Sequence, residues 1–317
     1  MKLRLLLAVL WGALALLSAN CGDAPPFTMR NAVAPQVTPT YDHSGNAVEP
    51  TLEYFPGGWN GYRYWLAISP YPHSNALLEN PSLLVSQDGN NWSVPPGLVN
   101  PIALPSANGH LGDGTIYFDN SSNELWAYYL EQIAMEGELF RKRSADGIHW
   151  TPAEPLLNAP AYAFLSPTVQ RLGNEYMMWS VNSGTVGCTA SSTSVELRTS
   201  PDGIHWSEPQ TTGLVQPNYR IWHINVKWIP ATHEFLALYS AFQKTCANDS
   251  LFLARSPDGM HWKTSAAPLL VPNPGHWDGI AIYRATGFLD PRTLSFRVWY
   301  SAEGTMGWRL GYTDKSN

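Results

Sequence analysis

The stretch Ser200-Pro201-Asp202-Gly203-Ile204-His205-Trp206 decides the fold, because the chain repeats it. The pattern Ser-x-Asp-Gly-x-x-Trp, which we call the box, occurs at 86–92, 144–150, 200–206 and 256–262. Its serines are 58, 56 and 56 residues apart, a period typical of propellers and repeat arrays. Asp-Gly is a tight-turn signal, since Gly accepts a positive φ and the Asp side chain accepts hydrogen bonds from its own turn. We therefore interpret the box as a structural turn, with its Trp as the packing anchor.

Strand-like segments flank each box and extend the repeat to four strands. A segment such as 194–199 precedes the box, an apolar stretch follows it, and an aromatic segment such as 176–179 lies upstream. The first strand of each unit opens with a small polar or acidic residue, and there are five such openings: Glu49, Asp113, Ser166, Asn225 and Asp278. The sequence thus predicts five units, although only four carry a box.

The fifth unit ends early, since 308–313 matches a third strand and the chain stops at Asn317. An open sheet edge favours aggregation and is normally covered. The segment Arg30–Val37 resembles the missing fourth strand, and we expect it to close the ring. These patterns predict an all-β fold, a five-bladed β-propeller with four-stranded antiparallel blades, formed as a single domain by residues 30–317.

The composition agrees with a β-rich, turn-rich protein. Of 317 residues, 44% are hydrophobic and 14% charged, with 25 Gly and 26 Pro, which favours sheets and turns over helices. The formal charge is −6, and removal of residues 1–20, which contain Lys2 and Arg4, leaves −8. An acidic chain without a basic cluster argues against a nucleic-acid partner. We expect a monomer.

Residues 1–20 are typical of an export signal, because Lys2 and Arg4 precede an apolar run from Leu5 to Leu17. The run is too short for a transmembrane helix. Cys21 then has the position of an acylated lipoprotein cysteine, although Asn20 before it is a poor match. Lipidation and simple cleavage both remain open, with residues 21–29 as a short exported segment. The product is expected to be periplasmic, secreted or membrane-anchored, with any membrane contact made only through the lipid.

Without Cys21, an even pair of cysteines remains, Cys188 and Cys246. They precede successive boxes by 12 and 10 residues, so they occupy corresponding loops of adjacent units. An oxidising compartment favours a disulfide between them. The alternative is two buried free thiols.

The five units, the acidic residues that open first strands and the Asp-Gly-x-x-Trp turns resemble propeller glycoside hydrolases of the arabinanase, xylosidase, levansucrase and invertase group. The run from Phe55 to Trp65 also resembles uncharacterised bacterial and phage-encoded relatives of that superfamily. The resemblance implies hydrolysis of a glycosidic bond by two carboxyl groups. It places a base or nucleophile at Glu49, where Asp is usual, and a supporting carboxylate at Asp113. It places the acid at Ser166, where Glu is expected and is missing.

Two substitutes for the missing acid are candidates. One is another carboxyl group on the same face, namely Glu131, Glu79 or Asp278. The other is His223, whose ordinary pKa near 6.5 permits proton transfer. Each also has a structural interpretation: Glu49 and Asp113 as acceptors for channel amides, His223 as a core histidine, and Glu79 as a loop cap.

In a propeller, the first strands line the central channel, and their starting ends form one face, opposite the boxes. Aromatic rings beside carboxylates and amides suit sugars, which present apolar faces and hydroxyls. The residues expected to bind an oligo- or polysaccharide there are His110, Tyr162, Trp222, Asn225, His276, Trp277, Glu79 and Tyr71. No metal-ligand spacing occurs, so no cofactor is predicted, although calcium in the channel through His110 and Asp113 or His276 and Asp278 stays open.

Two functions follow. The first is an exported glycosidase-like enzyme with its site at the channel mouth, using Asp113 with Glu49 or Asp278. The second is a catalytically inactive propeller that binds a glycan or a surface partner through the same face.

Overall fold

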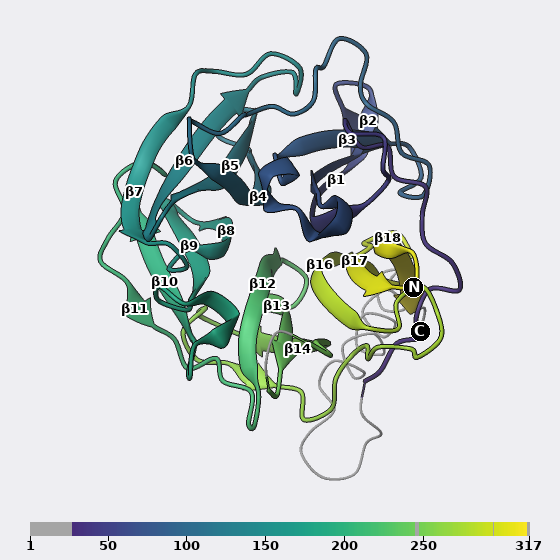
Figure 1. Cartoon of the computed structure of the whole chain (residues 1–317). Helices are drawn as coiled ribbons and strands as arrows, with labels where there is room; N and C mark the ends of the chain where they lie inside the picture. Colours follow the sequence, from purple (N-terminus) through teal and green to yellow (C-terminus); the bar gives the residue numbers. More distant parts are fainter. Residues whose placement is uncertain (1–26, 245–246, 294, 316–317) are drawn as a thin grey trace, which may run out of the picture.

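A computed structural model describes residues 27–244, 247–293 and 295–315 and shows five antiparallel sheets around a central axis (Figure 1). The predicted export signal, Cys21 and Cys246 lie outside these ranges, so export, lipidation and the disulfide stay predictions. The five-bladed propeller is confirmed. Its strands, blade by blade, are β1 (Ala47–Trp59), β2 (Tyr62–Pro70) and β3 (Ser82–Ser86); β4 (His110–Asp119), β5 (Glu124–Ile133), β6 (Glu136–Ser144) and β7 (Glu154–Pro160); β8 (Leu165–Leu172), β9 (Glu175–Asn182), β10 (Ser194–Ser200) and β11 (Gln210–Thr211); β12 (Arg220–Ile229), β13 (Glu234–Phe242), β14 (Ser250–Ser256) and β15 (Lys263–Thr264); and β16 (Ala281–Leu289), β17 (Phe296–Gly304) and β18 (Gly307–Lys315).

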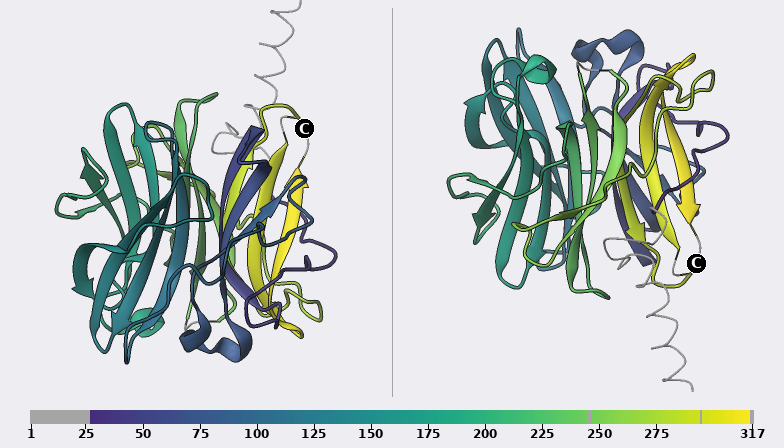
Figure 2. Two further views of the ribbon diagram at one scale, coloured as in Figure 1. Left: turned by 90° about the horizontal axis from the view of Figure 1, so that it is seen from above. Right: turned by 90° about the horizontal axis from the view of Figure 1, so that it is seen from below.

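Three short 3₁₀ helices decorate the connections between second and third strands: η1 (Pro72–Ser74), η2 (Ala76–Leu78) and η3 (Gly187–Thr189). The connection that carries η1 and η2, drawn in blue, projects from one face of the disc (Figure 2). Within the described ranges, no helix has the length and apolar character needed to cross a bilayer.

The outer edges of blades 1 and 5 are irregular. In blade 1, a single bridge between Val85 and Ser93 takes the place of a fourth strand. In blade 5, the predicted closing segment does lie along β18, where the Gln36 amide donates to the Leu310 carbonyl at 2.8 Å and the Thr313 hydroxyl donates to the Arg30 carbonyl at 2.6 Å. It covers the edge as an extended segment and not as a regular strand.

A buried clasp holds this segment against blade 5. The Asp278 carboxylate accepts hydrogen bonds from the Asn31 amide at 2.7 Å and the Tyr300 hydroxyl at 3.0 Å. The Trp277 indole donates to the Ala32 carbonyl at 2.9 Å. Asp278 and Trp277 thus close the ring.

Each box is a self-contained turn that joins two blades. In the third box, the Ser200 hydroxyl accepts from the Asp202 and Gly203 amides, and Asp202 Oδ1 accepts from the next two amides at 2.9 Å. The glycine then lies against a second-strand Trp of the preceding blade, because a Cβ on Gly203 would meet the Trp126 ring at 2.6 Å. The box tryptophans do pack against the core: Trp92 is buried, whereas Trp150, Trp206 and Trp262 are partly buried. The second-strand residue Trp126 is buried more deeply than Trp206.

Interactions between blades that are not neighbours in the ring cross the central channel. The Arg284 guanidinium of blade 5 donates to the Gly114 carbonyl of blade 2 at 3.2 Å. Nearer the box face, Lys227 of blade 4 pairs with Glu53 of blade 1 at 2.6 Å.

Candidate functional site at the channel mouth

Strained backbone at β-bulges positions the residues that open the first three blades. Glu49, Asp113 and Ser166 have φ of 59°, 55° and 53°, a left-handed conformation that residues other than Gly rarely adopt. The pairing of each first strand shifts at these positions. A bulge re-aims side chains, and strain of this kind clusters at functional sites. Here it points three polar side chains of adjacent blades toward the channel.

A cavity of about 250 Å³ opens at this mouth, on the face opposite the boxes. The first, second and third blades supply most of its wall, and the fourth and fifth complete it. Its lining consists of Glu49, Tyr71, Ala76, Glu79, His110, Leu111, Gly112, Asp113, Gln132, Tyr162, Leu165, Val186, Gly187, Cys188, Trp222, His223 and Tyr283.

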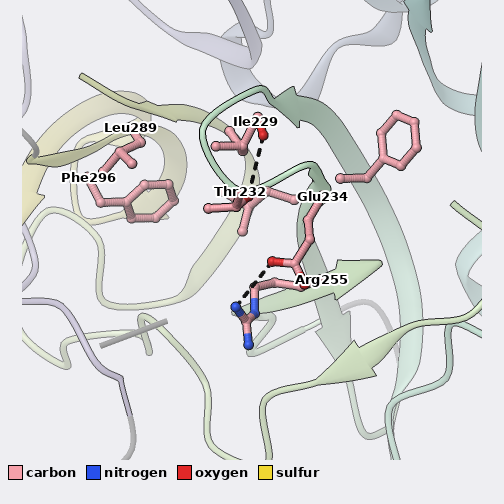
Figure 3. A pocket seen from close by; sticks show the side chains of 8 residues that line it. Ile229, Thr232, Glu234, Arg255, Leu289 and Phe296 are labelled. Carbon is pink, nitrogen blue, oxygen red and sulfur yellow. Dashed lines mark hydrogen bonds and ion pairs between the residues drawn. The ribbon is translucent and has the colours of Figure 1, made fainter. Parts of the chain in front are cut away.

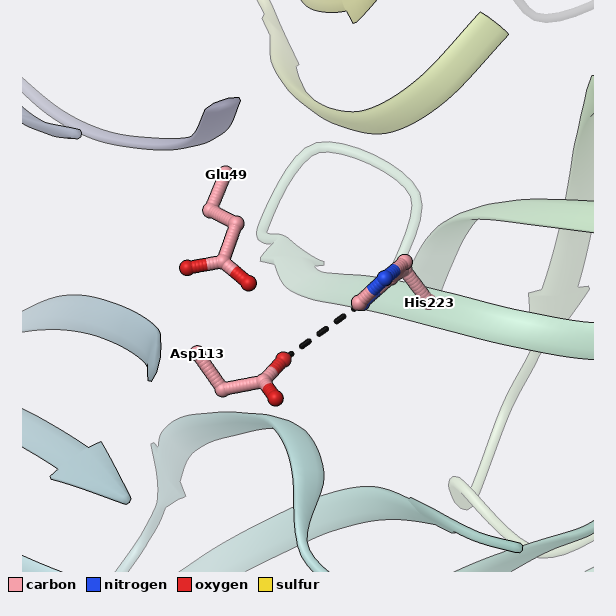
Figure 4. A group of neighbouring side chains, drawn as sticks. All are labelled: Glu49, Asp113 and His223. Atoms are coloured by element: carbon pink, nitrogen blue, oxygen red, sulfur yellow. Dashed lines mark ion pairs between the residues drawn. The ribbon is translucent and has the colours of Figure 1, made fainter. Parts of the chain in front are cut away.

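Glu49, Asp113 and His223 converge from β1, β4 and β12 (Figure 4). Each offers a ligand atom within 4.8 Å of the others, and all three residues are buried. His223 Nδ1 lies 3.4 Å from Asp113 Oδ1 and 2.6 Å from the Ser166 hydroxyl. Its other ring nitrogen, Nε2, is buried without a hydrogen-bond partner among the described residues.

The Ser166, His223 and Asp113 arrangement is not a nucleophilic triad. In a triad, the serine and the carboxylate bond opposite nitrogens of the imidazole. Here both contact Nδ1, and Ser166 donates its amide to Asp113 at 2.6 Å. Ser166 therefore orients Asp113 and His223.

Burial and local contacts together shift the pKa values of the carboxyl groups in opposite directions. Burial and the neighbouring Asp113 raise the pKa of Glu49 to about 8, and burial together with Glu49 and Asp113 raises the pKa of Glu79 well above its ordinary value. Burial alone would raise the pKa of Asp113 too, but contacts with His223, Arg284 and the Ser166 amide outweigh it and lower the pKa. Burial lowers the pKa of His223. Protonated and ionised carboxyl groups thus meet in one cavity.

The charge balance of this cluster favours a bound cation. Three carboxyl groups, Glu49, Glu79 and Asp113, share the cavity with a single nearby guanidinium, Arg284, 4.0 Å from Asp113. Buried carboxyl groups must be compensated by protons or by cations. Two carboxylates and an imidazole with a free nitrogen are a suitable ligand set for a divalent metal.

Eight of the sequence-predicted site residues line the cavity: Glu49, Asp113, His223, Glu79, His110, Tyr162, Trp222 and Tyr71. Ser166 stands directly behind them. Their proximity is observed, whereas their roles stay predictions.

Five predicted site residues lie elsewhere. Glu131 accepts the Ser106 amide at 2.5 Å and caps a loop. Asn225 accepts from the Thr286 hydroxyl at 3.1 Å inside the channel wall. His276 is exposed on a loop, and Asp278 and Trp277 form the clasp. In blades 4 and 5, the predicted first-strand openings, Asn225 and Asp278, do not coincide with the shifts in strand pairing. Those shifts flank Trp222 in blade 4 and the pair Tyr283-Arg284 in blade 5.

Tyr283 and Arg284 were not predicted from the sequence. Arg284 is fully buried, with Nε and Nη2 lacking partners among the described residues. An arginine inside the apolar run 281–288 was the available signal, since buried charges are rare outside functional or paired settings.

A second small cavity lies between blades 4 and 5 on the box face (Figure 3). It measures about 10 Å³, is walled by Leu236, Leu289 and Phe296, and is bordered by a Glu234–Arg255 pair at 3.3 Å. It has room for about one water molecule. The sequence has no box at this junction between blades 4 and 5.

No protein-family model matches the sequence. The N-acetyl-α-D-galactosamine deacetylase of Flavonifractor plautii, acting on the A type blood antigen, is 29% identical over 94% of this chain. This chain spans about half, 49%, of that relative's length. A crystal structure of an N-acetylgalactosamine deacetylase from F. plautii, with blood group B trisaccharide, has a TM-score of 0.80 and 27% identity, covering 92% of this chain and 94% of that one. The chain is thus similar in sequence and fold to N-acetylgalactosamine deacetylases. A Penicillium chrysogenum α-L-arabinanase, with a TM-score of 0.57, 10% identity and coverage of 92% of this chain and 99% of that one, shares the fold.

Proposed function

We propose that this protein acts on a glycan and hydrolyses the N-acetyl group of an acetamido sugar held in the channel-mouth cavity. The observation that carries the proposal is the buried cluster of Glu49, Asp113 and His223 at a cavity of about 250 Å³. A relative that is 29% identical over 94% of this chain is a deacetylase, and a deacetylase structure with a TM-score of 0.80 holds a trisaccharide. Both support a sugar ligand.

Amide hydrolysis requires an activated water, a polarised carbonyl and a proton for the departing amine. A divalent cation held by Glu49, Asp113 and His223 would polarise the carbonyl and lower the pKa of a bound water. The residues themselves are held in place for this task. Ser69 donates to Glu49 at 3.0 Å, and Ser166 fixes both Asp113 and His223.

Hydrolysis of a glycosidic bond is the second candidate, favoured by Glu49, whose raised pKa of about 8 suits an acid beside an ionised Asp113. Retaining enzymes hold their two carboxyl groups about 5–5.5 Å apart and inverting ones roughly 6.5–9.5 Å. The ligand oxygens of Glu49 and Asp113 lie within 4.8 Å of each other. Two carboxyl oxygens this close suit a shared cation or proton, and the similarity to a glycan deacetylase supports deacetylation as the first candidate.

The test compares acetate release with sugar release. Purified protein is incubated with oligosaccharides ending in N-acetylgalactosamine or N-acetylglucosamine, and with the matching aryl glycosides, before and after chelation. Acetate release that Asp113→Asn abolishes, and that the box variant Asp202→Asn retains, supports the proposal. Aryl or sugar release without acetate supports the glycosidase, and binding without either product supports the inactive propeller; both outcomes overturn the deacetylase.

We also propose that the protein is exported and that Cys188 pairs with Cys246. Cys188 lies in η3 at the wall of the cavity, so the disulfide would tie a site loop of blade 3 to blade 4. The mass of the non-reduced, alkylated protein tests this: two alkylated thiols at positions 188 and 246 would rule it out.

A further inference from the structure

Glu79 is a further carboxyl group in the cavity, and its side chain is hydrogen-bonded to Glu49 of the Glu49, Asp113 and His223 cluster. It follows η2 directly, and its amide donates to the Ala76 carbonyl at 3.1 Å, which ends the helical turn. Its carboxyl group lies over the backbone of Gly112, because a Cβ added there would sit 3.6 Å from the Glu79 carboxyl carbon. A glycine before Asp113 therefore leaves the space that Glu79 fills.

Aromatic rings and other acids surround Glu79, and cations do not. Tyr71 and Tyr283 both line the cavity and both interact electrostatically with the Glu79 carboxyl group. No ion pair within the described ranges involves Glu79, whereas Asp113 has His223 and Arg284. An acidic side chain that shares a cavity with tyrosine rings is a common setting for an ammonium group, which interacts favourably with both.

We propose that Glu79 is the specificity-determining residue for the nitrogen substituent of the sugar, and that with Tyr71 and Tyr283 it binds a primary ammonium. This inference rests on the proposed deacetylation for its substrate form, in which the acetamido N–H donates to Glu79. Hydrolysis adds one water across the amide: the C–N bond breaks, the water oxygen leaves in acetate, and the nitrogen takes both protons of the water and becomes an ammonium. The same carboxyl group then faces a cation in place of a neutral donor, so the product is held more tightly than the substrate.

This assignment predicts selectivity that a purely structural Glu79 would not produce. The cavity should favour an amino sugar over its hydroxyl counterpart, and N-acyl sugars over O-acyl sugars. Charge-assisted hydrogen bonds contribute about 1.5–3 kcal/mol, equivalent to about 10- to 100-fold in affinity.

The experiment measures the affinity of galactosamine and of galactose for the same protein by calorimetry, and repeats it with glucosamine and glucose. Wild type should bind an amino sugar at least about tenfold more tightly than its hydroxyl counterpart. Glu79→Gln should bring that ratio close to one, and Glu79→Asp should keep part of it. Glu136→Gln removes an exposed acid on the same face and outside the cavity, so it should leave the ratio unchanged.

The outcomes separate this inference from the proposed function. A wild-type ratio near one, or a ratio that Glu79→Gln does not change, overturns the role of Glu79 even if acetate is released. A ratio that depends on Glu79 in a protein that releases no acetate supports the ammonium site and removes deacetylation. Melting temperatures of the three variants, compared with wild type, establish that each is folded.

Discussion

The boxes and the channel-mouth cavity use the same three residue types with opposite results. In a box, Ser200, Asp202 and His205 form a local turn, with His205 Nδ1 2.7 Å from Asp202 Oδ2. At the mouth, Ser166, Asp113 and His223 come from three blades, with His223 Nδ1 2.6 Å from the serine hydroxyl. The side chain of His205 is 83% exposed and that of His223 only 2%.

The two regions also differ in whether their polar atoms have hydrogen-bond partners. The Asp202 carboxylate accepts hydrogen bonds from its own turn, and its contacts with His205 lower its pKa. His223 instead keeps a buried nitrogen without a partner, and Asp113 sits in a strained left-handed conformation. A composition of Ser, Asp and His therefore carries no chemistry by itself. Burial, strain and an unused polar atom at a cavity are what mark the second set as functional.

Removal of one carboxylate from each region should give the largest contrast. Asp113→Asn takes away a ligand and the ionised partner of His223, so acetate release should fall by about a hundredfold or more. Asp202→Asn should leave turnover within about twofold, because its side chain serves only its own turn on the opposite face. Rates measured on both variants at equal folded concentration check this, and equal losses would remove the distinction.

The box glycines should show the next largest effect, on stability and not on activity. Gly203 has φ 71°, and an added Cβ would meet Trp126 at 2.6 Å. Gly203→Ala should destabilise by roughly 3 kcal/mol through strain and overpacking. Gly173 is the matched control on the same face, with φ 62° and open space around its Cβ position; Gly173→Ala should cost only about 1 kcal/mol. Denaturant midpoints measure both, and equal costs would show that the Trp contact is unimportant.

The sequence predicts the fold far better than the site, for a physical reason. The box repeats because every blade junction that has one needs the same local turn, and Asp-Gly chemistry is readable within seven residues. The spacing of the boxes and of the strand-like segments predicted three features of the fold. These are the number of blades, the placement of the boxes on the face opposite the candidate site, and the covering of β18 by residues 30–37.

The site depends on contacts between blades that no local pattern encodes. Glu49, Asp113 and His223 could be named as candidates, but their convergence rests on bulges whose positions shift in blades 4 and 5. That shift is why Asp278, placed in register with Asp113, proved to be a clasp for Asn31, and why Arg284 was missed. In the sequence, an acidic residue that faces a ligand cannot be distinguished from one that faces the chain's own N-terminal segment, because both precede a strand.

Asp249 tests which of these properties mark a site. Like His223, it is buried and has a side-chain atom without a hydrogen-bond partner among the described residues, but it does not line the cavity. Burial raises its pKa to about 7. Since the folded pKa exceeds the ordinary value near 3.9, stability should fall as pH rises from about 4 to 7, and the full cost should persist above pH 7. Asp249→Asn should therefore stabilise the protein at pH 8 by roughly 2 kcal/mol, with little effect at pH 4 and unchanged turnover. Lost turnover in this variant would show that the site extends beyond the cavity.

The smallest effect should come from the acidities of the box aspartates. Contacts with His205 and with backbone amides lower the pKa of Asp202, and Asp146 and Asp258 are similarly lowered. A lowered carboxyl pKa gives stability that is present above the unfolded value, near 3.9, and is lost as pH falls below it. Because these pairs are exposed, each should contribute only about 0.5 kcal/mol. Thermal unfolding of Asp202→Asn should show that deficit at pH 7 and a progressively smaller deficit as the pH falls below about 3.9 toward the lowered pKa of the folded state. A deficit independent of pH would mean that the side-chain geometry, and not its charge, holds the box together.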